Sequence, residues 1–336
     1  MSLAPPIIIS GLSKRQLWAV VEMTVLWNQV KKQLKKDDRG KHDIVVDPRS
    51  IRWLIPDDDF LLEADGAGPF SLSPWAESQL CSRLGIPVKY FRNCPGKLKK
   101  MQIEYLVKHR VERGKHWRLR LRDSTIRGLV SGSYQPFDNR TVASVWESLG
   151  QHNRFKYESL LDETSFFMRA IVPNGENGND ELGGLMSGFY VRNSEVGRSG
   201  ISAGPIVYRL VCSNGLVVVQ DRKAFMYKRH IWIGEGAIAE MLNHAVSGSI
   251  DLSRKTTRVM AEARKVSVSP HALVRKLDKL ELDERLQQQT TDSFIAGSDH
   301  NVFGMVNALT AAARELPPHE RYELERSAGQ ILAEVA

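Results

Sequence analysis

The sequence lacks long apolar runs and has few cysteines. No apolar stretch reaches the ~20 residues of a membrane-spanning helix, and residues 5–10 are too short for the apolar core of a signal peptide. The three cysteines, Cys81, Cys94 and Cys212, show no metal-ligand spacing, and their odd number favours reduced thiols. We therefore expect a cytoplasmic protein without a membrane partner.

Catalytic and cofactor motifs are also lacking. The glycine-rich residues 173–188 contain neither the lysine of a phosphate-binding loop nor a strand–glycine–helix context, so we expect a hairpin loop there. Residues 57–59 are three aspartates in a loop after a proline, and adjacent carboxylates cannot all face one ion. His230 has no cysteine or carboxylate partner nearby in the sequence. We expect no metal, no cofactor and no catalytic residue, but a catalytic role for Glu195, His230 or the Asp57 cluster stays open.

The composition is that of an ordinary globular protein, with 42% hydrophobic and 26% charged residues in a chain of 336. This length accommodates two domains, or one large core with helical additions. We predict three regions: an N-terminal helix with a basic end (residues 1–40), an α+β core with a basic hairpin (41–234) and a helical C-terminal region (235–336).

Basic charge is concentrated in one segment. Residues 1–130 carry 24 Lys and Arg against 14 Asp and Glu, whereas the remainder carries 23 against 25. Residues 89–127 alone contain 13 basic and 3 acidic residues, a net charge of +10 in a chain whose total is +8. Such a segment is typical of a protein that binds a polyanion.

Residues 191–219 alternate turn residues with β-branched apolar residues, and we expect them to form the central scaffold. Asn214 and Gly215 separate two apolar runs and tolerate the positive φ of a type I′ turn, which predicts a hairpin with its turn at these two residues. Further strands are predicted within residues 41–53, 117–122 and 155–172. The fold class is therefore α+β, with a curved antiparallel sheet and β-hairpins backed by helices.

Helix-end signals are clearest around residues 71–83. Ser73 is a suitable N-cap, Pro74 suits the first helical position, and Gly85 follows the last turn. Helical patterns also occur at residues 13–36, 98–111, 140–149, 236–246, 252–265, 270–286, 300–315 and 319–335. The C-terminal helices either pack a domain or form an oligomer interface.

Side chains alternate along a strand, so residues 117–122, WRLRLR, put three apolar side chains on one face and three arginines on the other. Arginines about 7 Å apart suit successive phosphates. Aromatic residues nearby offer surfaces on which unpaired bases stack: Tyr90, Phe91, Tyr105, Trp117 and Tyr134. The alternative interpretation is an arginine face matched to acidic partners elsewhere in the chain.

We predict nucleic acid as the partner, with single-stranded DNA favoured and phosphate neutralisation in place of base readout. The predicted binding residues are the cations of the basic segment, one tyrosine and two cations of a second basic group: Lys97, Lys99, Lys100, Lys108, Arg110, Lys115, Arg118, Arg120, Arg122, Arg127, Tyr134, Lys228 and Arg229. Two other functions remain open. One is a nucleic-acid-processing enzyme, and the other is a protein-interaction or host-defence antagonist whose basic face meets an acidic protein.

Asn193, Ser194 and Glu195 form a polar motif flanked by turn residues. They form either a ligand site or a turn in which the Asn and Ser side chains bond the local backbone. In another alternative, Glu195 pairs with an arginine such as Arg209 or Arg192. We favour the structural role.

Five segments form a recognisable pattern: WAESQLCSRLGIPVKYF (75–91), SGSYQPFDN (131–139), RNSEVGRSGISAGPIVYRLVCSNGLV (192–217), VNALTAAAR (306–314) and LERSAGQIL (324–332). Together they resemble the phage/plasmid-like protein family, a domain-of-unknown-function family encoded by phages, plasmids and bacterial genomes, over about residues 41–331. The resemblance implies a protein of a mobile element inside a bacterial host cell and brings no catalytic residues. A looser similarity to single-strand annealing recombinases implies strand annealing by a homo-oligomer.

Overall fold

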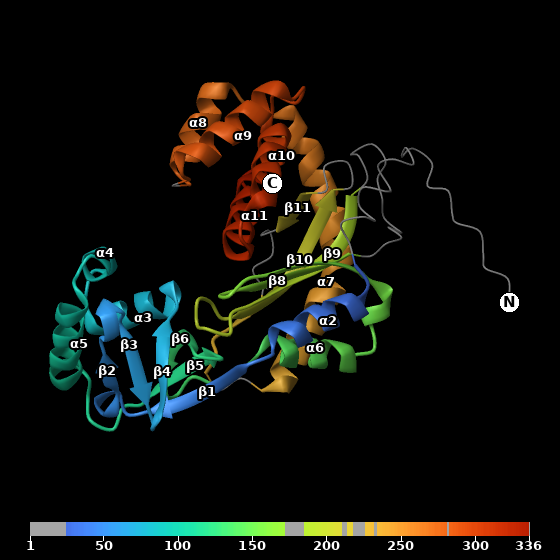
Figure 1. Ribbon diagram of the computed structural model, residues 1–336. Helices are drawn as coiled ribbons and strands as arrows, with labels where there is room; N and C mark the ends of the chain where they lie inside the picture. Colours follow the sequence, from blue (N-terminus) through green and yellow to red (C-terminus); the bar gives the residue numbers. More distant parts are fainter. Residues whose placement is uncertain are drawn as a thin grey trace.

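A computed structural model of the chain describes residues 25–171, 185–209, 214–217, 226–231, 234–280 and 282–335. Within them the strands form two six-stranded sheets, and helices pack on both. Figure 1 shows the first sheet and its helices at the lower left, the second sheet in the centre and the C-terminal helices above it. The α+β class with a helical C-terminal region is confirmed. None of the helices in these residues is long and apolar enough to cross a membrane.

The first sheet is built from the first 131 residues. Its strands, in spatial order, are β1 (Lys41–Val46), β5 (Trp117–Arg122), β6 (Thr125–Ser131), β4 (Ala67–Leu72), β3 (Leu61–Ala64) and β2 (Arg52–Leu54). Neighbouring strands are antiparallel except β4 and β6, which are parallel. The predicted basic hairpin is the β5–β6 pair, and its turn contains Asp123 with a φ of 50°.

Three helices complete this half: α3 (Pro74–Leu84), α4 (Val88–Arg92) and α5 (Gly96–Arg110). The start of α3 is as predicted, because the Ser73 hydroxyl accepts a hydrogen bond from the Ala76 N–H at 3.1 Å. The helix ends at Gly85, whose left-handed φ of 67° suits a residue without Cβ. Leu80 of α3 and Ile103 of α5 bury one face of the sheet.

The second sheet contains, in spatial order, β11 (Asn214–Val217), β10 (Ile201–Arg209), β9 (Leu185–Asn193), β8 (Phe166–Ile171) and β7 (Lys156–Leu161), and β12 (Met226–Lys228) pairs with β10. The predicted position of the hairpin turn is wrong. Arg209 pairs with Asn214, so Asn214 begins β11 and the connection is in residues 210–213, outside the described residues. Most of the glycine-rich residues 173–188 also lie outside them, and the last few belong to β9.

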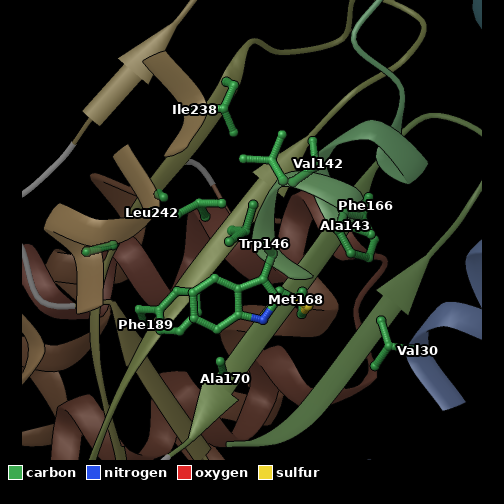
Figure 2. Packing of buried hydrophobic residues seen from close by; sticks show 14 of the residues in the cluster. Val30, Val142, Ala143, Trp146, Phe166, Met168, Ala170, Phe189, Ile238 and Leu242 are labelled. Carbon is green, nitrogen blue, oxygen red and sulfur yellow. The ribbon is translucent and has the colours of Figure 1, made fainter. Parts of the chain in front are cut away.

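One face of the second sheet is covered by α2 (Trp27–Asp37), α6 (Asn139–Ser148) and α7 (Glu235–Lys265). Figure 2 shows Trp146 of α6 among Phe189, Met168 and Leu242 in this core. The ring centroids of Trp146 and Phe189 are 4.9 Å apart. Burying one side chain of the size of phenylalanine stabilises a fold by about 1.5–3 kcal/mol, so this cluster holds α6 and α7 firmly on the sheet.

The opposite face of the second sheet is covered by α11 (Pro318–Ala333). Side chains alternate along β8, so Phe166 and Met168 join the core of Figure 2 whereas Phe167 packs against Tyr322 of α11. Both faces of β8 are therefore covered, which explains why all six of its residues are buried.

Four charged side chains are buried between this face and α11. Arg169 of β8 pairs with Glu158 of β7 at 2.9 Å and with Glu325 of α11 at 3.2 Å. Arg321 of α11 pairs with the same two carboxylates at 2.8 and 3.1 Å. Two arginines and two glutamates thus neutralise one another where the last helix meets the sheet.

The C-terminal helices α8 (Pro270–Asp278), α9 (Glu284–Ala296), α10 (Val302–Ala312) and α11 form a further core with the end of α7. Two predicted boundaries are wrong. α7 is continuous where helices over 236–246 and 252–265 were expected, and the helix expected over 270–286 divides into α8 and α9. The division occurs because Asp283 caps α9, accepting a hydrogen bond from the Leu286 N–H at 2.8 Å. Short 3-10 helices are Pro48–Ser50, Pro56–Asp58, His152–Arg154 and Ala313–Glu315.

The helix predicted over residues 13–36 is described only in its final part, as α2, because residues 1–24 lie outside the described residues. Gly40, with a φ of 71°, follows α2 as the sequence indicated. The division into regions at residues 40 and 234 stays a prediction.

Candidate nucleic-acid interface

The predicted alternation along β5 is present. Its apolar side chains join the core with α3 and α5, and its arginines project from the other face of the strand. That face meets α2, the start of α6 and the loop 194–200. The arginine face therefore lies at the junction between the two halves of the molecule.

Each β5 arginine is paired with carboxylates. Arg118 and Arg120 share Asp43 of β1, at 3.2 and 3.1 Å, because Asp43 lies directly opposite Arg120 in the strand register. Burial acts to lower the pKa of Arg120, but Asp138 and Asp43 outweigh burial and raise it above its usual range. The remaining pairs are Arg120 with Asp138 and Arg122 with Asp37 and Glu163.

Glu195 is the centre of the same junction. Its carboxylate accepts hydrogen bonds from Lys41 Nζ at 2.7 Å, from Arg127 at 3.0 Å and from the Asn139 N–H at 2.9 Å. Burial acts to raise the pKa of this carboxyl, but Lys41 and Arg127 lower it to about 2. The main-chain carbonyl of Glu195 accepts a further hydrogen bond from Arg120. A single buried residue thus joins both halves of the chain.

Asn193 and Ser194 hold the turn that carries Glu195. Asn193 Nδ2 donates to the Phe137 carbonyl at 2.9 Å, and the Ser194 hydroxyl donates to the Thr164 carbonyl at 2.6 Å. Tyr134 Oη donates to the carbonyls of Ser194 and Glu195 at 3.2 and 3.0 Å. The side chains of this motif make structural contacts, but only Ser194 bonds the local backbone as the sequence favoured, by accepting from the Arg198 N–H at 2.9 Å.

Glu195 does pair with an arginine, Arg127, but Arg192 is wrong as its partner and the pairing with Arg209 stays a prediction. Arg192 pairs instead with Glu323 of α11, at 2.9 Å, and the side chain of Arg209 lies outside the described residues. Lys41 and Arg127 take the place of Arg192 because the turn points toward the first sheet.

Burial at the junction limits which predicted residues a nucleic-acid strand can reach. Arg120 and Arg127 are 3% and 4% exposed and Tyr134 is 8% exposed, so each must leave its partners to contact a phosphate or base. Arg118 and Arg122 are partly exposed and paired. This geometry matches the alternative interpretation, an arginine face with acidic partners. Nucleic-acid binding by these residues stays a prediction.

The lysines of α5 have different surroundings. Ile103 and Val107 are buried against the first sheet, so Lys97, Tyr105 and Lys108 lie on the outward side of the helix. No described residue forms an ion pair with Lys97 or Lys108. Their charges are available to a partner.

The other predicted cations near α5 differ in availability. Lys100 and Lys115 have only exposed glutamate neighbours, at 3.8 and 3.5 Å. Lys99 lies 5.5 Å from the centroid of the Phe91 ring, and Arg110 donates to the Leu84 carbonyl at 2.7 Å, where it caps the end of α3. The second basic group, Lys228 and Arg229, is exposed at the end of β12.

An apolar groove of about 490 Å³ is formed by α4 and α5. Tyr90 and Tyr105 line it and are 50% and 62% exposed. Gln102 donates a hydrogen bond of 2.7 Å to the Tyr90 hydroxyl, and the Tyr105 ring lies 4.4 Å from that of His109. Phe91 and Trp117, the other aromatic residues predicted for stacking near α5, are buried.

The Asp57 cluster and His230, for which a catalytic role was left open, make contacts within the fold. Asp58 accepts a hydrogen bond from the Gly96 N–H at 2.8 Å, at the start of α5. The described part of the chain contains no group of three or more His, Cys, Asp or Glu placed to hold a metal. His230 stacks on Tyr134 at 4.9 Å, and burial together with Arg120 lowers its pKa to about 4.

Lys41, Asp43 and Asp138 complete the junction, and sequence reasoning missed them as partners. One signal was available for Asp43, which lies in a short predicted strand, where a carboxylate is stabilised by a cation directly opposite on the neighbouring strand. No local pattern connects Lys41 with Glu195, which is 154 positions later.

The domain of unknown function DUF932 matches residues 127–313. This match covers more than half of the chain, so the chain belongs to the DUF932 family. The matched region contains Arg127, Glu195 and His230 and begins after α4 and α5. No curated protein and no solved structure matches the chain.

Proposed function

We propose that this DUF932 protein binds single-stranded nucleic acid, DNA in preference, without catalysing a reaction, and that α4 and α5 form the binding surface. The observation that carries the proposal is the pair of exposed tyrosines in an open apolar groove beside unpaired lysines. Single-strand binding proteins combine these two features, because every base has a flat face and every nucleotide has a phosphate.

Tyr90 and Tyr105 supply the stacking surfaces. Stacking of a base on an aromatic side chain contributes about 1–3 kcal/mol and depends little on sequence. The hydrogen bond from Gln102 holds the Tyr90 ring in place, so little side-chain freedom is lost on binding.

Lysines on the outward side of α5 and after it supply the phosphate contacts. Lys97 and Lys108 flank Tyr105 on the helix surface, and Lys100 and Lys115 extend the positive surface. The lysine ammonium group is a hydrated point charge on a flexible side chain. It therefore suits contacts with the phosphates of a nucleic-acid strand, which carry no sequence information. Lys228 and Arg229 provide a second contact for a longer strand.

Strand annealing is a finer proposal. Stacking on tyrosines engages the faces of the bases and leaves their pairing edges free for a complementary strand. The resemblance of residues 131–139 and 192–217 to the phage/plasmid-like family supports a role in phage or plasmid recombination, as a homo-oligomer in the bacterial cytoplasm. The same resemblance supports single-stranded DNA ahead of RNA.

The proposal is tested by fluorescence polarisation with a labelled DNA strand, the same sequence as RNA and the matching duplex, each over a salt series. We expect the single strand to bind most tightly, with affinity that falls steeply as salt rises. In the triple variant Lys97→Gln/Lys100→Gln/Lys108→Gln the slope of log affinity against log salt should decrease by about 2, since each single-strand phosphate contact contributes about 0.7.

The matched control is Lys255→Gln/Lys279→Gln/Arg285→Gln, which removes the same charge from exposed positions on α7, directly after α8 and on α9. Equal losses in the two triple variants would mean that net charge, not the α5 surface, drives binding. No binding by folded wild-type protein at low salt would overturn the proposal.

A second candidate is suggested by the largely apolar lining of the groove, which also suits an acidic protein segment with hydrophobic anchors. Binding of such a peptide that is lost in Tyr105→Ala, together with failure to bind any nucleic acid, would favour this candidate.

A further inference from the structure

A second pocket, of about 310 Å³, opens where α3, β6, the loop 194–200 and β12 meet. This volume is at the lower end of the range for small-molecule sites. The pocket belongs to neither the groove on α5 nor the ion pairs of Glu195. Its lining includes Arg83, Arg198, Ser199, Arg229 and His230.

The lining is cationic. Three arginines, Arg83, Arg198 and Arg229, are among the residues that line the pocket, and none of the described lining residues has a carboxylate. The Arg198 side chain is fixed by two contacts. Its guanidinium lies 5.3 Å from the centroid of the Trp75 ring, and it donates a hydrogen bond of 3.3 Å to the Thr164 hydroxyl. Arg83 donates to the Leu129 carbonyl at 3.3 Å. An anion is the complementary ligand.

A buried polar atom in this lining lacks a partner. Ser199 Oγ makes no hydrogen bond with a described residue, whereas the buried His230 ring is bonded to the Gln135 backbone. An unsatisfied buried hydroxyl is costly, so its presence in a pocket wall indicates a ligand that bonds it.

One wall of the pocket is aromatic. Tyr227 is 59% exposed, and its ring lies against Gly200, where a Cβ would come within 2.9 Å of a ring atom. The glycine therefore allows the tyrosine ring to pack against the backbone. The ring face is then available for a planar group.

We propose that this pocket binds a nucleoside 5′-monophosphate, with the phosphate bonded by Arg198, Arg229 and Ser199 and the base stacked on Tyr227. Two kinds of ligand carry this combination of a phosphate monoester and a base: a free nucleotide and the 5′ end of a phosphorylated strand. The site does not depend on the α4–α5 surface.

The test is calorimetric titration of the whole protein with adenosine 5′-monophosphate, adenosine and a 5′-phosphorylated trinucleotide. We expect saturable binding of the monophosphate and binding of adenosine at least about 10-fold weaker, the loss that corresponds to charged hydrogen bonds. A trinucleotide that binds more tightly than the monophosphate would identify a strand end as the source, and the reverse order a free nucleotide.

Two variants connect the binding to the pocket. Ser199→Ala and Arg198→Gln should each weaken monophosphate binding about 10-fold, whereas Arg154→Gln, an exposed arginine outside the pocket, should not. The Lys97/Lys100/Lys108 triple variant should bind the monophosphate as the wild type does, which separates this site from the proposed single-strand surface. Equal affinity for adenosine and its monophosphate, no binding of any probe, or unchanged binding in Ser199→Ala would overturn the proposal.

Discussion

The arginines of β5 and the lysines of α5 are less than 30 residues apart in sequence and have opposite surroundings. The arginines face carboxylates from four other segments, whereas Lys97 and Lys108 face solvent. The planar guanidinium makes several directed bonds and suits a buried junction, while the strongly hydrated ammonium group stays at the surface. A dense run of positive charge therefore contains both cations that hold the fold and cations that are free to bind a partner.

The largest expected effect is loss of stability in Glu195→Gln. The substitution leaves Arg127 and Lys41 buried beside a neutral amide, which should lower the free energy of unfolding by about 3–5 kcal/mol. Urea unfolding followed by circular dichroism measures the change.

The control for that measurement is Glu147→Gln. Glu147 pairs with Lys31 at 2.6 Å, but both side chains are more than a third exposed, so its loss should cost less than about 1 kcal/mol. Similar losses in the two variants would show that the junction is no stronger than a surface ion pair.

The second prediction concerns acid. Because the pKa of Glu195 is lowered from 4.5 to about 2 by folding, its ionised form stabilises the folded state above pH 4.5, and this contribution is lost as pH falls toward 2. It amounts to on the order of 3 kcal/mol. The difference in unfolding free energy between wild type and Glu195→Gln should therefore be constant from pH 7 to 5 and shrink below pH 4. A difference that does not change with pH would contradict the lowered pKa.

The third prediction compares an exposed tyrosine, Tyr105, with a buried one, Tyr134. Tyr105→Ala should weaken single-strand binding by about 1–3 kcal/mol and leave the melting temperature unchanged, because the side chain is 62% exposed. Tyr134→Phe should do the reverse, losing about 1 kcal/mol of stability with its hydroxyl hydrogen bonds and leaving binding unaffected. If Tyr134→Phe binds single strands more weakly and is as stable as the wild type, the junction around Glu195 contacts nucleic acid after all.

The smallest expected effect is that of one exposed lysine. Lys108→Gln should reduce the salt slope of single-strand binding by about 0.7 and change stability by less than about 0.5 kcal/mol. Lys279→Gln, also exposed but at the end of α8, is the control and should leave the slope unchanged.

The sequence predicted the elements whose signals are local. The Ser73 cap, Pro74 and Gly85 define α3, and the alternation of residues 117–122 defines β5, because the physics of both is contained in a few neighbouring residues. The exposed tyrosines Tyr90 of α4 and Tyr105 of α5 were also in the predicted stacking set, since a basic segment with several aromatic residues has few ways to bury them all.

What the sequence did not show depends on distant contacts. Whether Arg120 meets a phosphate or a carboxylate is decided by Asp43, Asp138 and Glu195, which come from a strand, a helix start and a turn. The break expected within α7 near Gly248 is absent because the helix is held by cores at both ends, which outweighs the weak helix propensity of glycine and serine.

The buried pairs of Arg169 with Glu158 and Glu325 set an order of events during synthesis of the chain. Arg169 and Glu158 leave the ribosome long before Arg321 and Glu325, so the second sheet meets its last helix only after most of the chain has been made. Until then, one face of β8 lacks the helix that covers it. This core of the chain is thus expected to complete its folding late, and factors that shield exposed strands would act on it during that interval.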